Sequence, residues 1–284
     1  MQKTNYIQFK KQRELGDILT VTFKFIRENY KALFRNILKV TGPFFLIMVA
    51  ALGYYTWSVA GSPFEALSNG FGNFIISFSV LAFALLLFYS ALYGTVFHYI
   101  KSYVENDGAV VDEAVKQGVQ EDFLKLLLLF FLTGILILAG LVLFVIPGIY
   151  VMVPLSLAAA ILVFKRYSVT DAISYSFDLV KNHWWMTFLT LLVIMMLVYI
   201  IGLVFQIPLI IYMIVKTFTM VQEGSVADPS AFTDWPFLVL NVISSVIQYL
   251  LSVISVIAIG FIYFNLNEHK NLTGTFETIE NLGN

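Results

Sequence analysis

The run FLKLLLLFFLTGILILAGLVLFVI, from Phe123 to Ile146, contains a single charged residue, Lys125. A helix needs about 20 apolar residues to cross about 30 Å of hydrocarbon, so this run predicts a membrane-spanning helix. Pro147 and Gly148 follow it, and a second apolar stretch begins at once without a charge between the two. Proline ends a helix and glycine accepts unusual backbone angles, which predicts a tight hairpin between two spans.

Other apolar stretches of similar length flank this hairpin on both sides. We expect six spans in all: Ile37 to Ala60, Phe71 to Ile100, Phe123 to Ile146, Gly148 to Phe164, Trp184 to Ile207, and Phe237 to Phe264. The composition agrees, because 59% of residues are hydrophobic and only 12% are charged, against roughly 25% charged residues in soluble domains. The predicted fold class is all-α, a polytopic integral membrane protein with one membrane domain over residues 1–284.

The basic residues are sorted to one side of these spans. With the N-terminus inside, all of the 17 lysines and arginines except Lys216 fall on the same side. Cytoplasmic loops retain positive charge, so both termini are predicted to be cytoplasmic, in an inner or plasma membrane.

Three amphipathic stretches are predicted to lie in the cytoplasmic interface. One belongs to a basic arm over residues 1–36, and the others lie near residues 109–122 and 168–184; a short cytoplasmic tail covers residues 265–284. Asp17, Asp112 and Asp171 suit the positive end of each helix dipole. Each stretch precedes two spans, which indicates either three internal repeats or the spacing that all amphipathic helices share.

The fifth span leaves an alternative open. Apolar sequence continues past Pro208 to Val215, so this segment is either one long kinked helix or a helix followed by a segment on the outer surface. About fourteen residues is too short for a separate crossing.

A family resemblance is carried by the segment from Pro147 to Phe188. Its motifs are Pro147-Gly148-Ile149-Tyr150, Val153-Pro154-Leu155-Ser156-Leu157-Ala158, the stretch from Ser168 to Lys181, and Trp184-Trp185. They resemble the membrane domain of some bacterial glycerophosphodiester phosphodiesterases and of related uncharacterised multi-pass families, which implies a bacterial cytoplasmic (inner) membrane protein. In those enzymes a separate soluble barrel performs hydrolysis, and such a barrel needs about 250 residues. We expect no barrel here, so the resemblance implies the membrane fold and no catalytic residue.

Three histidines lie near the predicted cytoplasmic boundary: His98, His183 and His269. Together with Asp107, Asp112 or Asp178 they offer metal ligands, but their spacing matches no known ligand pattern. The chain has no cysteine, which excludes thiolate ligands and disulfides. We expect the histidines to anchor helices, and we expect no metal and no other cofactor.

Polar residues form one helical stripe on the last span. They are Asn241, Ser244, Ser245, Gln248, Ser252 and Ser255. Polar groups in hydrocarbon must face protein or water. The stripe favours helix packing, in which small hydroxyl residues allow close approach. The alternative is a polar cleft, open to the outer leaflet, that receives a lipid headgroup or a small solute.

The span interiors contain almost no ionisable residue and no base beside a serine. We therefore expect neither an enzyme nor an ion-coupled transporter. The predicted function is a scaffold-like or lipid-interacting role in envelope maintenance. The predicted partners are membrane lipids and a membrane or cytoplasmic protein, with no nucleic acid. The alternative is a transporter or channel-like protein for an uncharged or lipidic substrate, built on the polar stripe.

Overall fold

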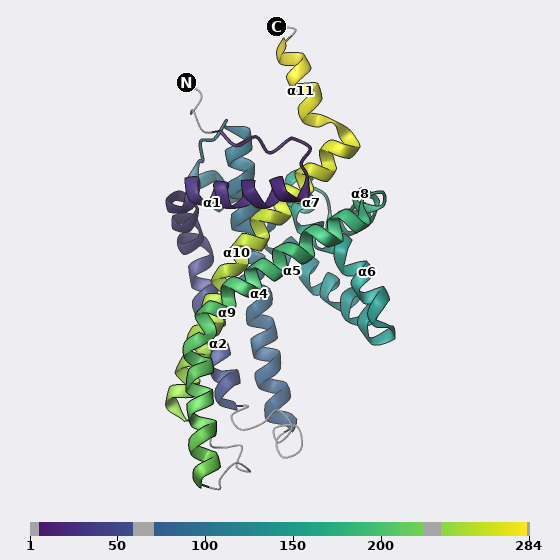
Figure 1. Cartoon of the computed structure of the whole chain (residues 1–284). Helices are drawn as coiled ribbons and strands as arrows, with labels where there is room; N and C mark the ends of the chain where they lie inside the picture. The colour runs from purple at the N-terminus through teal and green to yellow at the C-terminus, as the bar shows by residue number, and fades with distance from the viewer. Residues whose placement is uncertain (1–5, 59–70, 224–233, 283–284) are drawn as a thin grey trace. The chain divides into compact units, whose positions relative to one another are not determined.

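The structure is a computed structural model that describes residues 6–58, 71–223 and 234–282 (Figure 1). Within these ranges every regular element is a helix. The elements are α1 (Leu15–Asn36), the π-helical η1 (Ile37–Thr41), α2 (Gly42–Ser58), α4 (Phe71–Glu105), α5 (Asp112–Leu143), α6 (Val145–Leu155), α7 (Ala158–Lys165), α8 (Val169–Val180), α9 (Trp184–Glu223), α10 (Trp235–Asn271) and α11 (Thr273–Leu282).

Among the described residues, six helical stretches are long and apolar enough to cross a membrane, which confirms the predicted all-α, six-span fold. They are Leu15–Ser58, Phe71–Glu105, Asp112–Leu143, Val145–Lys165, Trp184–Gln222 and Trp235–Asn271. The predicted end of the first span at Ala60, and Lys3 of the basic arm, lie outside the described residues.

Several helices extend beyond the predicted spans, and two of them decide points that the sequence analysis left open. α5 runs without a break from Asp112 to Leu143, so the stretch near residues 109–122 continues directly into the third span. α9 passes through Pro208 and ends at Glu223, which selects the single long helix from the two alternatives. Apolar residues on both sides of Pro208 keep the chain helical although the proline lacks an N–H donor.

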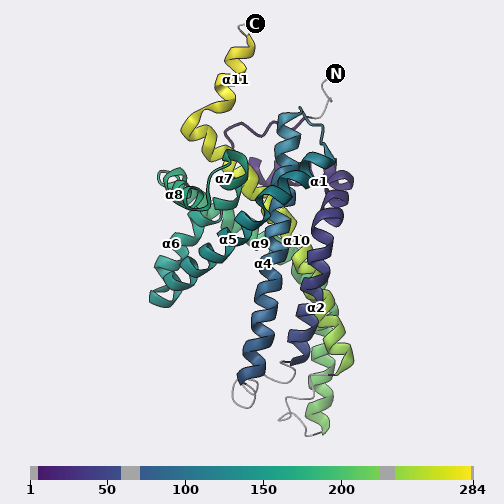
Figure 2. The same ribbon diagram turned by 180° about the vertical axis from the view of Figure 1, so that it is seen from behind.

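The predicted hairpin joins α5 and α6, which lie side by side when seen from both sides (Figure 2). The turn is made at Phe144, whose backbone is extended (φ −160°, ψ 143°). Pro147 lies in the first turn of α6, where a missing N–H leaves no hydrogen bond broken. Gly148 is needed for close approach, because a Cβ atom there would come within 2.5 Å of the Leu141 side chain.

The described residues divide into two compact units. The first consists of Met1–Thr41, Tyr89–Met196 and Val253–Asn284, and the second of Gly42–Phe88 and Leu197–Ser252. α4, α9 and α10 each contribute to both units.

The second unit is built on contacts between α2, α4, α9 and α10. The Phe88 ring of α4 lies 5.8 Å from Phe45 of α2 and 6.1 Å from Tyr249 of α10, between ring centroids. Beside α10, Lys216 of α9 forms an ion pair of 2.8 Å with Asp234, which precedes the first turn of α10. This ion pair holds the pKa of Asp234 below its ordinary value.

The first unit is centred on the short helix α7, in which six consecutive residues from Ala158 to Val163 are buried. The irregular N-terminal residues 6–14, called the strap below, pack against α1, α4 and α10. Phe9 of the strap is fully buried and its ring stacks on Phe261 at 4.2 Å. The backbone N–H of Arg13 donates to the side-chain oxygen of Asn265 at 2.7 Å. The strap is therefore part of the core of this unit.

Helix α1 buries one face and exposes the other. Ile18, Thr22 and Phe25 are buried, at the spacing of a single helical face. Tyr30 and Phe34 are 55% and 51% exposed. The exposed rings are available to lipid, and the predicted interfacial position of α1 stays a prediction.

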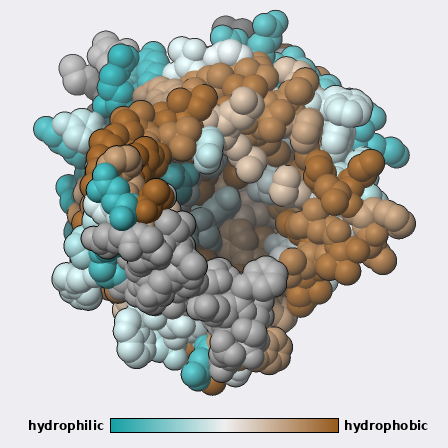
Figure 3. Space-filling view, turned by 60° about the horizontal axis from the view of Figure 1, so that its bottom comes forward, coloured by the Kyte–Doolittle hydropathy of each residue, from teal (hydrophilic) through white to brown (hydrophobic). Residues whose placement is uncertain are grey.

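Apolar side chains also cover much of the molecular surface, and Figure 3 shows hydrophobic residues in brown over wide areas of one face. The tip of the α5–α6 hairpin is an example, since Val142, Phe144 and Ile146 are 83%, 74% and 81% exposed. Contiguous apolar surface of this kind is unfavourable in water and suits a hydrocarbon environment.

Candidate functional site

The polar stripe of the sequence analysis lies on α10. Ser244 is buried and the other five residues, Asn241, Ser245, Gln248, Ser252 and Ser255, are half-buried. The first five positions of the stripe, up to Ser252, belong to the second unit, whereas Ser255 belongs to the first. The hydroxyl of Ser252 donates to the backbone oxygen of Tyr249 at 2.5 Å, so it is used within its own helix.

Gln248 shows what the stripe does within the second unit. Its side chain lies against Gly202 of α9, where a Cβ atom would meet the Gln248 amide oxygen at 2.1 Å. A glycine opposite a longer polar side chain is the contact that helix packing predicts. The amide oxygen of Gln248 is nevertheless buried without a hydrogen-bond partner among the described residues. A polar cleft therefore stays an open prediction at this position.

The histidines and aspartates weighed as metal ligands lie in separate places. His98 pairs with Asp122 at 3.2 Å, Asp112 with Arg35 at 3.0 Å, and Asp178 with Lys270. The ring centroids of His183 and His269 are 4.7 Å apart. Within the described ranges no group of three histidine, aspartate or glutamate residues is positioned to hold a metal ion.

The first unit contains a groove of about 700 Å³ between α6 and the start of α9, called the aromatic groove below. Its lining residues are Ile146, Ile149, Tyr150, Lys181, Asn182, His183, Trp184, Trp185, Met186 and Phe188. The lining is apolar and aromatic, except at the turn between α8 and α9, which supplies one cation and two further polar side chains.

The two walls of this groove are joined by a hydrogen bond that replaces one missing from the backbone of α6. Pro154 lies inside α6 and has no N–H, so the carbonyl of Tyr150, four residues earlier, lacks its helical donor. The indole N–H of Trp184 donates to this carbonyl at 3.2 Å. Buried or lipid-facing carbonyl groups need a donor, so Pro154 creates an acceptor that Trp184 of α9 satisfies.

Ring stacking holds Trp184 in the same orientation. Its ring stacks on Tyr150 at 5.4 Å and on Phe188 at 5.3 Å, with interplanar angles of 19° and 8°. Trp185 meets Trp184 edge-on at 4.9 Å and is 71% exposed. One tryptophan is thus a wall of the groove, and the other is exposed beside it.

The lining of the aromatic groove combines polar and apolar side chains. Lys181 and Asn182 are exposed on the turn between α8 and α9, whereas Ile146 and Ile149 come from the first turns of α6. The arrangement offers a cation to a charged group and apolar surface to a chain attached to it.

Comparison with known proteins adds the family. Residues 64–225 match the model of an uncharacterised protein family (UPF0259). The chain belongs to this family. Searches of curated proteins and of solved structures gave no match.

The UPF0259 segment contains every residue that lines the aromatic groove. The membership supports an uncharacterised helical membrane family, and the resemblance to phosphodiesterase membrane domains stays a prediction. That resemblance rested on Pro147 to Tyr150, Pro154 and Trp184-Trp185. The same motifs form the groove, because they supply lining residues and the carbonyl that Trp184 contacts. Sequence reasoning missed their contact, although a proline inside an apolar span followed by a tryptophan pair was a signal for it.

Proposed function

We propose that this protein is a non-enzymatic, lipid-interacting protein of the bacterial cytoplasmic membrane, with both termini in the cytoplasm, and that the aromatic groove binds one anionic phospholipid. Its role is scaffold-like, in maintenance of the cell envelope. The observation that carries the proposal is one groove lined by both Lys181 and apolar side chains such as Ile146, with a wall held by the Trp184 hydrogen bond.

The chemistry of the groove matches the two parts of such a lipid. Lys181 lies on the side to which nearly all basic residues are sorted, and a basic residue at the surface of an anionic leaflet contributes about 1 kcal/mol. The rings of Tyr150 and Trp184 and the side chain of Ile149 offer apolar contacts to an acyl chain.

A binding role is also supported by what the lining lacks. The ten residues of the groove include no carboxylate, serine or threonine. Hydrolysis would need a nucleophile and a base held within hydrogen-bond reach. His183 has no such partner in the lining and lies instead against His269.

The experiment uses the tryptophans of the groove as reporters. The chain contains four tryptophans, and replacing Trp57 and Trp235 by phenylalanine leaves Trp184 and Trp185. This variant is placed in nanodiscs with brominated phosphatidylglycerol or brominated phosphatidylcholine, which quench nearby indoles. We expect the anionic lipid to quench at a lower mole fraction than the zwitterionic lipid.

The headgroup preference is assigned with two matched variants. Lys181→Gln removes the cation of the groove, and we expect it to abolish the preference for the anionic lipid. Lys116→Gln removes one charge from α5 outside the groove lining and should keep the preference. Equal quenching by both lipids in the parent protein would refute the proposal.

A transporter for an uncharged or lipidic substrate is the second candidate, and the partnerless amide oxygen of Gln248 favours it. It requires a hydrated path along the polar stripe. Cysteine labelling, described in the Discussion, separates a hydrated path from helix packing.

A further inference from the structure

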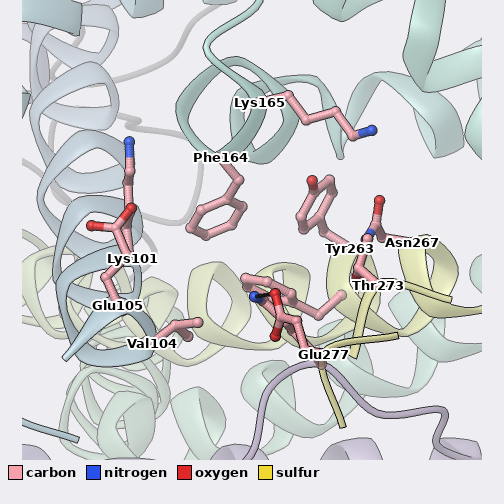
Figure 4. Close-up of a pocket in the computed structure, with 11 residues that line it drawn as sticks. Lys101, Val104, Glu105, Phe164, Lys165, Tyr263, Asn267, Thr273 and Glu277 are labelled. Carbon is pink, nitrogen blue, oxygen red and sulfur yellow. Dashed lines mark hydrogen bonds and ion pairs between the residues drawn. The ribbon is translucent and has the colours of Figure 1, made fainter. Parts of the chain in front are cut away.

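A second cavity of the first unit, of about 280 Å³, lies at the C-terminal ends of α4 and α7 (Figure 4). The strap, α10 and α11 complete its walls. Its lining residues are Lys10, Lys101, Val104, Glu105, Phe164, Lys165, Tyr263, Phe264, Asn267, Thr273 and Glu277. None of them lines the aromatic groove, and we call this cavity the lysine pocket.

Three lysines from three different elements reach the lysine pocket, against two glutamates. Lys10 of the strap is already paired with Glu277 of α11. Among the described residues no carboxylate lies within 4.0 Å of the ammonium group of Lys101 or of Lys165. Both lysines are half-buried, so part of their hydration is lost without an anionic partner in return.

Lys165 contacts aromatic rings and, among the described residues, no carboxylate. Its ammonium group lies over the Tyr175 ring at 4.6 Å and over the Tyr167 ring at 5.8 Å. Lys270 lies over the Tyr175 ring at the same 4.6 Å, and it also pairs with Asp178, which keeps the pKa of Asp178 below its ordinary value. Lys165 therefore shares an aromatic ring with a like charge, and an anion in the pocket would bind it better than a ring does.

Aromatic rings and hydrogen bonds form the remaining walls of the pocket. In Figure 4 the Phe164 ring lies beside Lys101, and the Tyr263 ring lies beside the side chain of Lys165. Asn267 donates to the hydroxyl of Thr273 at 3.0 Å, and the buried carboxylate of Glu268 accepts from the backbone N–H of Gly274 at 2.8 Å. These bonds fix the first turn of α11, which holds Glu277 and through it Lys10.

We infer that the lysine pocket binds a phosphate group, carried by a soluble molecule or by a lipid headgroup. Lysine binds phosphate as a mobile point charge, and two such charges without carboxylate partners match a group that carries one to two negative charges. The aromatic walls suit an organic group attached to the phosphate. This site is distinct from the aromatic groove and does not depend on the function proposed for it.

The test measures phosphate binding by the full chain in two arms. In the first, purified protein in an uncharged detergent is titrated with inorganic phosphate and with pyrophosphate by isothermal calorimetry. In the second, retention of phosphatidylglycerol against phosphatidylcholine is measured by native mass spectrometry. We expect the double variant Lys101→Gln/Lys165→Gln to bind about tenfold more weakly than the parent protein in one arm. That arm is the first if the natural ligand is a soluble phosphate, and the second if it is a lipid headgroup.

The matched control is Lys24→Gln, which removes an exposed lysine of α1 outside the pocket lining. Weakening in the first arm identifies a soluble phosphate, and weakening in the second identifies a headgroup. The inference is overturned if the pocket variants match the control in both arms. If the double variant does not fold, Lys165→Gln alone decides, because it breaks no ion pair to a carboxylate. A Lys181→Gln variant should leave this binding unchanged, which separates the pocket from the groove.

Discussion

The hydrogen bond between Trp184 and Tyr150 allows a quantitative prediction, because Pro154 leaves the Tyr150 carbonyl without its helical donor. Trp184→Phe removes the donor and leaves the Tyr150 carbonyl unpaired, which costs about 1–3 kcal/mol in general. The bond is 3.2 Å long and Tyr150 is 56% exposed. We therefore expect the low end of that range, about 1 kcal/mol, in addition to the loss of ring contacts.

Pro154→Ala supplies the N–H that α6 lacks, so the Tyr150 carbonyl regains its helical donor. In that background Trp184→Phe should lose only the ring contacts. The two substitutions should therefore show a coupling energy of about 1 kcal/mol in a double-mutant cycle. The cycle cancels the cavity left by Pro154→Ala and the smaller ring at position 184.

The assay is reversible unfolding of the full chain in mixed micelles titrated with sodium dodecyl sulfate. Trp185→Phe is the matched control, since Trp185 contacts Trp184 edge-on and, among the described residues, makes no hydrogen bond to α6. This control should show no coupling with Pro154→Ala. If Trp184→Phe has the same effect in both backgrounds, within about 0.3 kcal/mol, the proline does not create the acceptor that Trp184 satisfies.

Three further predictions test other parts of the structure. Phe9→Ala should release the strap, because Phe9 is fully buried against Phe261 and large-to-small core changes of this kind cost about 3–5 kcal/mol. Limited proteolysis should then cut residues 6–14 faster than in Lys11→Ala, a control at an exposed position of the strap. An unchanged rate of cleavage would contradict the packing. Gly118→Ala should destabilise the first unit by about 1–3 kcal/mol, since a Cβ atom would meet the His98 ring at 2.2 Å. The control is Gly134→Ala on the same helix, whose Cβ atom meets nothing within 4 Å and which should stabilise the helix. Equal unfolding midpoints of the two variants would refute this. Single cysteines at Asn241, Gln248 and Ser252 should resist a charged thiol reagent if the stripe packs against protein, and rapid labelling at Gln248 would support the transporter instead.

The spans were predictable because a bilayer imposes length and apolarity on every crossing helix. The α5–α6 turn shows the limit of that reasoning. Its position followed from Pro147 and Gly148, but the structure turns at Phe144, and the two residues serve the first turn of α6 and its close approach to α5. Hydropathy records how apolar a segment is and not which partner each residue meets.

The candidate sites were less accessible to sequence reasoning. Lys10, Lys101 and Lys165 are far apart in the chain, and the predicted sorting of basic residues to one side of the membrane is enough to explain each of them alone. Trp184 and Tyr150 were recognised as parts of the motifs that carry the family resemblance, but their hydrogen bond depends on how α6 and α9 meet. The stripe on α10 was visible from helical spacing, and its Gln248–Gly202 contact needed the structure.

The central claim is that the aromatic groove holds one anionic phospholipid, and native mass spectrometry of the full chain released from bacterial membranes tests it most directly. Ile149→Trp fills the groove, and Ile135→Trp adds the same ring to an α5 position that is 48% exposed and outside the lining. We predict that the parent protein and the Ile135→Trp variant retain an anionic phospholipid that Ile149→Trp loses. Equal retention by all three proteins, or no retained phospholipid in the parent, would contradict the claim.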